Sequence, residues 1–414
     1  MKLSRRQFTR LASGGLAFAS LQGTLSTAGL AQEKPIKVAN ILDQTGGLNI
    51  YSLKQMKAVA MAADEINKAG GLLGRPIELI FYDAQSSNQL YSQYATQALL
   101  RDEVDVIHGG VTSSSREVIR PIVGRFKGLY VYNSLYEGGV CDRRHVSTGM
   151  VPGQQLDALC PYVVNELGGK KGYILAADYN YGHITSKWLQ KYIRELGGED
   201  LAVEFIPLDV SNFSSVIARI QDAKPDVVWS ALVGAAHMSF YRQFHATIGT
   251  DKMMLASTTY SIGREHVELA PEEGKGIILA TSFYDGLDTP AANDFVRRFK
   301  EYTGENDYIG EYGEGGYRGM SLWAEAVRRA GSAEPDAVME ALGGTSVEGA
   351  GGLYTIDGQT NHTIMNIHVA VQDDKQEFEA IRTFDQMPPI DTQLVCNLNE
   401  NPNDTTQYEV QRDC

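Results

Sequence analysis

Side chains with hydroxyl groups gather where three predicted strands end. Ser113 follows one strand, Tyr132 and Ser134 close a second, and Tyr179 and Tyr181 follow a third. Serine and tyrosine hydroxyls both donate and accept hydrogen bonds, and tyrosine rings also shield a ligand from water. These residue types suit a small neutral polar ligand such as an amide or urea, whereas a charged ligand requires a facing ion. The pattern therefore predicts a site that binds a ligand without reacting with it.

Strand and helix patterns alternate along most of the chain and predict how these residues are positioned. We expect strands followed by helices at 36–42, 77–82, 104–108 and 129–132, and again, after Val151-Pro152-Gly153, at 172–176, 201–207, 227–232 and 253–257. Repeated strand–helix units require a parallel sheet with helices on both faces. We therefore predict an α/β fold with two doubly wound parallel-sheet lobes. In open sheets of this kind ligands bind at the carboxyl ends of the strands, which predicts a hinged cleft between the lobes.

The last third of the chain has a different pattern. A strand at 276–281 and helices at 291–302 and 316–330 come first. The segments 351–356, 364–371 and 378–384 then alternate like antiparallel strands, with turns at Asp357-Gly358 and Asp373-Asp374. After Pro388-Pro389 the composition becomes polar and rich in Asn, which predicts an extension held by its cysteines.

Length and charge restrict the class of protein. At 414 residues the chain is too long for one core and long enough for two domains. Residues 1–31 contain four of the 37 basic residues and none of the 51 acidic ones, so the remainder carries 33 basic residues against 51 acidic ones, a net charge of −18. We expect no nucleic-acid partner for such an acidic protein.

The N-terminus has the features of an export signal. A basic start precedes an apolar stretch of small residues, and the sequence suits cleavage after Ala31. The run from Ser4 to Phe8, Ser-Arg-Arg-Gln-Phe, resembles the twin-arginine signature, which predicts export of the folded protein to the periplasm. Gly, Ser, Thr and Gln interrupt the apolar stretch well short of the ~20 residues that a membrane span needs. We therefore expect no stable membrane insertion.

Four cysteines, Cys141, Cys160, Cys396 and Cys414, lie in the exported part of the chain. An even number in an oxidising compartment favours disulfide bonds. The simplest connectivity joins Cys141 to Cys160 and Cys396 to Cys414, because each bond then closes a short loop. The sequence leaves the other two connectivities and free buried thiols open.

No motif in the sequence indicates an enzyme. The chain has no Gly-x-Ser-x-Gly, His-Glu-x-x-His or phosphate-binding Gly-x-x-x-x-Gly-Lys motif, and the glycines between Gly313 and Gly319 miss the dinucleotide spacing. The eight histidines form no recognisable pairing with a nucleophile. There is also no Cys-x-x-Cys motif. We therefore predict no catalytic residues, no cofactor and no metal.

Several stretches, taken together, resemble a known family. They are Gly70-Gly71-Leu72-Leu73-Gly74, Thr112 to Arg116, Tyr132 with Tyr136-Glu137-Gly138, Pro152-Gly153-Gln154-Gln155, Asp178-Tyr179-Asn180-Tyr181, Asp288-Thr289-Pro290 and Asn361-His362. Across essentially the whole mature chain the sequence resembles the type I periplasmic solute-binding proteins of the branched-chain amino acid class. Within that class it is similar to the subgroup that binds urea and short-chain aliphatic amides.

The resemblance implies two lobes that close on a ligand, joined by three crossovers. Lobe 1 would comprise 33–150 and 278–344, and lobe 2 would comprise 151–277 and 345–390, between a signal peptide at 1–31 and an extension at 391–414. It also implies that the residues named above contact the ligand, together with Tyr51 and Ser261. Gly182 stands where the subgroup usually has a proline.

By the same resemblance, the protein would be the extracytoplasmic substrate-binding protein of an ABC transporter. It would deliver urea or a short-chain amide to membrane permease subunits. Two alternatives remain at this point: a protein that binds branched-chain or other neutral amino acids, and an amide- or urea-responsive sensor that regulates a partner protein. The export signal argues against a cytoplasmic sensor.

Overall fold

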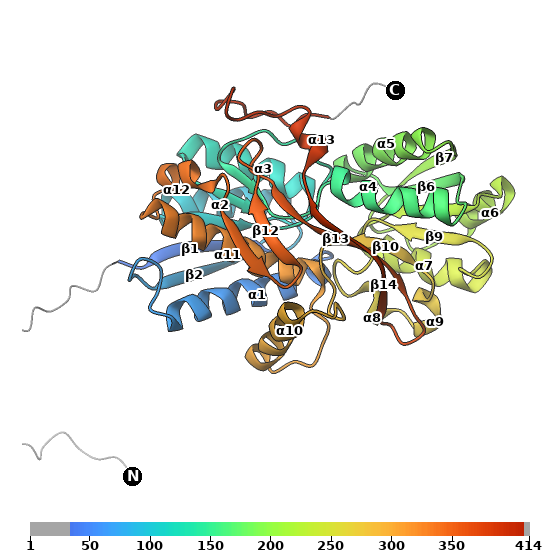
Figure 1. Cartoon of the computed structure of the whole chain (residues 1–414), viewed down its shortest axis with the longest axis horizontal. Helices are drawn as coiled ribbons and strands as arrows, with labels where there is room; N and C mark the ends of the chain where they lie inside the picture. The colour runs from blue at the N-terminus through green and yellow to red at the C-terminus, as the bar shows by residue number, and fades with distance from the viewer. Residues whose placement is uncertain (1–33, 410–414) are drawn as a thin grey trace, which may run out of the picture. The chain divides into compact units, whose positions relative to one another are not determined.

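The computed structural model describes residues 34–409 (Figure 1). The predicted signal peptide and Cys414 lie outside the described residues. No helix within 34–409 combines the length and the apolar character that a membrane crossing demands.

The first sheet has the strand order β2-β1-β3-β4-β5, and all its strands are parallel. The strands are β1 (Ile36–Leu42), β2 (Ile77–Asp83), β3 (Val106–Gly109), β4 (Tyr130–Tyr132) and β5 (His145–Ser147). The helices α1 (Asn49–Lys68), α2 (Asn88–Leu100) and α3 (Ser113–Phe126) connect them. Nearly every residue of β1 is buried, as expected for a strand with both faces covered.

The second sheet contains nine strands in the order β11-β12-β13-β10-β9-β8-β6-β7, with β14 beside β13. Its parallel strands are β6 (Lys171–Ala177), β7 (Glu199–Ile206), β8 (Val227–Ala231), β9 (Met254–Ser257) and β10 (Ile278–Thr281). Its antiparallel strands are β11 (Ser346–Gly349), β12 (Gly352–Ile356), β13 (Thr363–Gln372) and β14 (Phe378–Met387). The predicted change from parallel units to antiparallel strands is therefore confirmed.

Within residues 34–409, ten further α-helices follow α3 along the chain. They are α4 (Pro152–Pro161), α5 (Asn180–Glu195), α6 (Ser214–Ala223), α7 (Ala235–Thr247), α8 (Glu265–Glu268), α9 (Pro271–Gly274), α10 (Pro290–Thr303), α11 (Gly310–Ala330), α12 (Pro335–Leu342) and α13 (Ile390–Gln393). The helix predicted at 154–167 is α4 followed by a π-helical turn, Tyr162–Glu166.

The chain crosses between the sheets more than once. After β10, which pairs with β9 and β13, it continues into α11, which packs against α1 beside the first sheet. It then returns to the second sheet at β11. Sheet order alone does not test the predicted lobe boundaries, which stay a prediction.

The predicted disulfide pairing is wrong. Cys141 is bonded to Cys396, 255 residues along the chain, with 5.2 Å between the Cα atoms. The predicted bond between Cys396 and Cys414 is therefore wrong as well. Cys160 is fully buried within α4 and has no disulfide partner among residues 34–409. Loop length misled the prediction because the fold, not distance along the chain, decides which Cα atoms come within bonding reach.

The C-terminal extension packs against the segment between β4 and β5, next to the disulfide. Cys141 and Cys396 form a small apolar cluster with Leu398. The N–H of Cys141 donates to the carbonyl of Thr406 (2.9 Å), and a β-bridge joins Val140 to Gln407. The predicted extension held by its cysteines is thus confirmed for one disulfide.

Candidate ligand-binding site

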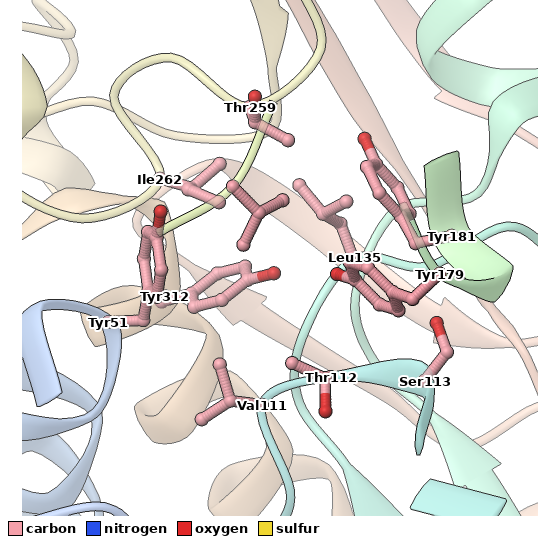
Figure 2. A pocket seen from close by; sticks show the side chains of 11 residues that line it. Tyr51, Val111, Thr112, Ser113, Leu135, Tyr179, Tyr181, Thr259, Ile262 and Tyr312 are labelled. Carbon is pink, nitrogen blue, oxygen red and sulfur yellow. The ribbon is translucent and has the colours of Figure 1, made fainter. Parts of the chain in front are cut away.

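A small cavity lies among loops that follow strands of both sheets (Figure 2). Its walls are Tyr51, Val111, Thr112, Ser113, Leu135, Tyr179, Tyr181, Val233, Thr259, Ile262 and Tyr312. The loops after β3 and β4 supply one side, and the loops after β6, β8 and β9 supply the other. The carboxyl ends of strands in both sheets therefore meet at one place, as the sequence predicts.

The cavity is small, and its walls are uncharged. About 290 Å³ of space between atoms lies there, part of it open to solvent, and only about 10 Å³ lies far enough from every wall to hold the centre of a water molecule. Within residues 34–409, the side chains that line it are aliphatic, phenolic or alcoholic, with no acid, amine, guanidinium or imidazole among them. Space of this size holds about one water molecule, and it is the chemistry of the walls that suits a small neutral guest held by hydrogen bonds.

The loop before α3 places Ser113 at the cavity wall. Thr112 is the N-cap of α3, and its side chain accepts from the N–H of Ser115. The Ser115 Oγ in turn accepts from the N–H groups of Val111 (3.1 Å) and Thr112 (3.0 Å). Because these two residues cap the helix, the Ser113 side chain is free for another role.

The hydroxyl of Ser113 is bonded to a buried ion pair. Its Oγ donates to Glu137 Oε2, and Glu137 Oε1 accepts from Arg116 Nη2 at 2.8 Å. The side chains of Arg116 and Glu137 are both 0% exposed. The Arg116 guanidinium also lies 4.3 Å from the centre of the Tyr136 ring. Glu137 therefore orients a cavity residue without touching the cavity itself.

Tyr132 and Ser134 lie behind the cavity rather than in its wall. The Tyr132 hydroxyl donates to the carbonyl of Val111 (3.0 Å), and the Ser134 hydroxyl donates to the carbonyl of Gly110 (3.2 Å). Neither residue lines the cavity. In this structure both support the loop that carries Ser113, since β4 ends beside that loop.

Tyr179 and Tyr181 come from the opposite wall, at the start of α5. Their ring centres are 6.1 Å apart, and the Tyr181 hydroxyl lies 2.8 Å from Thr258 Oγ1. A Cβ atom at position 182 would lie 2.0 Å from the carbonyl oxygen of Ala177, so glycine is the residue that fits this turn. Burial raises the pKa of both tyrosines above the ordinary value, which keeps the phenols protonated.

Tyr51 and Ser261 differ in their relation to the cavity. Tyr51, in α1, lines the cavity. Its hydroxyl accepts from the N–H of Gly234 (3.0 Å), in the loop after β8 of the second sheet. Ser261 is buried with a left-handed backbone (φ 69°) and does not line the cavity. Its neighbour Ile262 takes that place.

Tyr312 is a cavity residue that the sequence did not reveal. It lies on α11, and its ring packs edge-on against Tyr51 with 5.9 Å between ring centres. Its hydroxyl points toward the middle of the cavity in Figure 2 and has no hydrogen-bond partner among the described residues. The available signal was the glycine-rich start of α11, since closely spaced helical glycines indicate close contact with another helix.

Two ionisable groups lie behind the second wall, and burial keeps both neutral. Glu265 Oε2 accepts from the N–H of Gly263 (3.0 Å), and burial raises the pKa of this carboxyl to about 8. His237 Nε2 lies 2.7 Å from the Tyr241 hydroxyl, and burial lowers the pKa of this imidazole to about 3. At neutral pH neither group adds charge to the wall.

Comparisons with known proteins give one family. A family profile described as periplasmic binding protein matches residues 35–377. Leu/Ile/Val-binding protein homolog 7 of Brucella abortus (strain 2308) is 22% identical over 356 residues, which cover 80% of this chain and 86% of that protein. Leu/Ile/Val-binding protein homolog 3 of Brucella melitensis biotype 1 is 23% identical over 346 residues, which cover 82% and 91%.

Solved structures show the same fold. A solute binding protein of an ABC transporter from Rhodopseudomonas palustris BisB5, in complex with 3,4-dihydroxy benzoic acid, has a TM-score of 0.78 and 21% identity, covering 86% of this chain and 98% of that one. A leucine binding protein from Thermotoga maritima MSB8 has a TM-score of 0.74 and 20% identity, covering 84% and 99%. The predicted α/β fold with two parallel-sheet lobes is confirmed. Since the matched profile spans most of the sequence, the chain belongs to the periplasmic binding protein family.

Proposed function

We propose that this protein is the exported substrate-binding component of an ABC transporter and that it carries urea or a short-chain amide. One observation carries the proposal: the cavity between the sheets is small and is lined by hydroxyl and apolar groups, with no charged side chain. Hydroxyl groups satisfy a ligand that both donates and accepts hydrogen bonds, and the lack of a facing ion disfavours a charged one.

The proposed contacts come from both sheets. Ser113 would hold the ligand from one side, and Tyr179 with Tyr181 from the other, while Tyr51 and Tyr312 close the remaining wall. Tyr132, Ser134 and Ser261 would support these contacts from behind. A state in which both sides touch the ligand is stabilised by binding, so the ligand shifts the protein toward closure. Membrane permease subunits would then receive the ligand from the closed form.

The arrangement of the chain is part of the proposal. The two sheets would belong to lobes formed by 33–150 with 278–344 and by 151–277 with 345–390. Export to the periplasm by the twin-arginine route would precede ligand binding.

A neutral amino acid is the second candidate ligand. The names of the Brucella relatives favour it, because these proteins are described as homologues of Leu/Ile/Val-binding proteins. A free amino acid carries an ammonium and a carboxylate, and both would need partners when buried. The uncharged cavity wall supports the amide over the amino acid.

A thermal-shift screen on residues 32–414 would test the proposal. The ligands are urea, acetamide, propionamide, leucine, valine and benzoate. A ligand that binds only the folded protein raises the unfolding midpoint. We expect urea or an amide to give the largest rise and to release no ammonia on incubation. A larger rise with leucine, valine or benzoate would refute the amide assignment, and ammonia release would refute binding without chemistry.

A further inference from the structure

The hydrogen bond between Ser113 and Glu137 has a fixed direction. Glu137 Oε1 is paired with Arg116, whose guanidinium keeps its charge, so Glu137 is an ionised carboxylate that only accepts. The Ser113 Oγ therefore donates its single proton to Glu137 Oε2. What remains on Ser113 for the cavity is a pair of acceptor sites.

The opposite wall offers donors. The Tyr51 hydroxyl accepts from the N–H of Gly234, which leaves its own proton free. The phenols of Tyr179 and Tyr312 form no hydrogen bond with residues 34–409, and burial raises the pKa of both, so they keep their protons. The cavity thus has acceptor sites at Ser113 and phenolic donors at Tyr51, Tyr179 and Tyr312 (Figure 2). A primary amide matches this polarity, because it has N–H groups at one end and a carbonyl at the other.

We propose that Glu137 is a positioning residue that fixes Ser113 as a hydrogen-bond acceptor, and that the site thereby selects ligands with an N–H group over their carboxylate isosteres. This inference rests on the proposed function and adds a physical reason why the site would prefer amides to carboxylates. Acetate has the shape of acetamide but presents only acceptors, so at Ser113 two acceptors would face each other.

The C-terminal extension helps to hold this arrangement. Arg116 Nη2 also donates to Gln407 Oε1 (2.7 Å), and Gln407 Nε2 donates to the carbonyl of Gly138 (2.8 Å). Gln407 lies beyond residues 35–377, the part of the chain that the family profile matches. Gln407, which bonds to Arg116 of the ion pair, therefore lies outside the part of the chain that matches the family.

The test compares acetamide with acetate by calorimetric titration of residues 32–414. In Glu137→Gln the new amide can donate to Ser113 and accept from Arg116, so the serine proton becomes free to point at the ligand. We expect the affinity ratio of acetamide to acetate to fall by about tenfold or more. Glu117→Gln is the matched control, because Glu117 also pairs with Arg116 (2.9 Å) but has no bond to Ser113. It should leave the ratio unchanged.

A second variant covers the case in which Glu137→Gln does not fold. Ser113→Ala removes the acceptor and should weaken acetamide about tenfold while leaving acetate nearly unchanged. An unchanged ratio in Glu137→Gln, an equal fall in Glu117→Gln, or an equal loss of both ligands in Ser113→Ala would overturn the inference.

A measurement without ligand separates this inference from the proposed function. Carbon-13 NMR of protein labelled at glutamate carboxyls should show the Glu137 signal move in ligand-free Ser113→Ala, because the donated hydrogen bond is lost. If that signal moves but the wild type binds neither urea nor acetamide, the proposed function fails and the positioning role stands. If the signal does not move, the positioning role fails even where amides bind.

Discussion

The proton of each cavity hydroxyl decides what that residue can offer a ligand. The Ser113 hydroxyl donates its hydrogen bond to Glu137, whereas the phenols of Tyr179 and Tyr312 have no hydrogen-bond partner among the described residues. A phenol that faces a cavity without a protein partner can still bond to a ligand or to water. We therefore interpret these phenols as groups kept available for a bound molecule.

Tyr312→Phe should weaken amide binding about three- to tenfold, since one hydrogen bond is lost while the ring contact with Tyr51 remains. The unfolding midpoint without ligand should stay within a degree or so, because the hydroxyl has no protein partner within 34–409. Calorimetric titration and a thermal scan measure the two effects. Tyr302→Phe, at a residue 43% exposed, is the control. Equal loss of stability in the absence of ligand would make Tyr312 a structural residue.

Glu265 should make the protein less stable as the pH rises. Its folded pKa, about 8, is above the unfolded value of 4.5, so the folded state binds the proton more tightly. The resulting stabilisation is complete below pH 4.5 and is lost as the pH rises to about 8, a change of a few kcal/mol at most. Glu265→Gln should therefore lose less stability than the wild type between pH 5 and 8, as measured by guanidinium chloride unfolding at each pH.

The control for that experiment is Glu268→Gln, at a neighbouring residue whose side chain is 47% exposed. It should follow the wild-type pH profile. If Glu265→Gln and the wild type lose stability in parallel, the carboxyl is not held neutral in the folded protein.

At the scale of elements, the contact between α1 and α11 positions one wall of the cavity. These helices bring Tyr51 and Tyr312 together. The approach is close at Gly316, where a Cβ atom would lie 2.7 Å from the backbone oxygen of Gln55. A side chain at this position would force the helices apart.

Gly316→Ala should lower the free energy of unfolding by about 1–3 kcal/mol and weaken ligand binding, because it displaces Tyr312. Gly124→Ala in α3 is the matched control. A Cβ atom there meets nothing within 4 Å, so alanine should be neutral or stabilise the helix by up to about 1 kcal/mol. Guanidinium chloride unfolding of both variants measures the difference, and similar stability in both would show that α1 and α11 tolerate a side chain at their contact.

Hydrophobic periodicity predicted most elements within a few residues, because it reports directly which face of a strand or helix is buried. Strand 36–42 matches β1, and the tail segments 364–371 and 378–384 match β13 and β14. Short elements such as β5 and β11 were missed, since three or four residues carry too little pattern.

The site was predicted in part, for a similar physical reason. Residues at strand ends, such as Ser113 and Tyr179, could be placed because parallel strands all end at one edge. Tyr312 could not, because it reaches the cavity from a helix whose packing partner is far away in sequence. That Leu135 rather than Tyr132 lines the cavity likewise depends on the path of the loop after β4, which the local pattern does not specify.

For the whole molecule, one disulfide ties the C-terminal extension to the segment after β4. The bond between Cys141 and Cys396 closes a very long loop, so it restricts the unfolded chain strongly. We predict that Cys141→Ala with Cys396→Ala lowers the free energy of unfolding by about 2–5 kcal/mol. Peptide mapping without reductant should recover the two cysteines in one linked fragment. A fragment that joins Cys141 to Cys160 would contradict the structure.

The central claim is that the cavity between the two sheets binds a small neutral ligand through hydroxyl groups. The most direct test is a crystal structure of residues 32–414 grown with the ligand that gives the largest thermal shift. The account predicts an amide or urea in this cavity, with an N–H group on Ser113 Oγ and its carbonyl facing the phenols of Tyr312 or Tyr51. A ligand bound elsewhere, or a charged ligand in the cavity beside a side chain that has turned in to pair with it, would contradict the account.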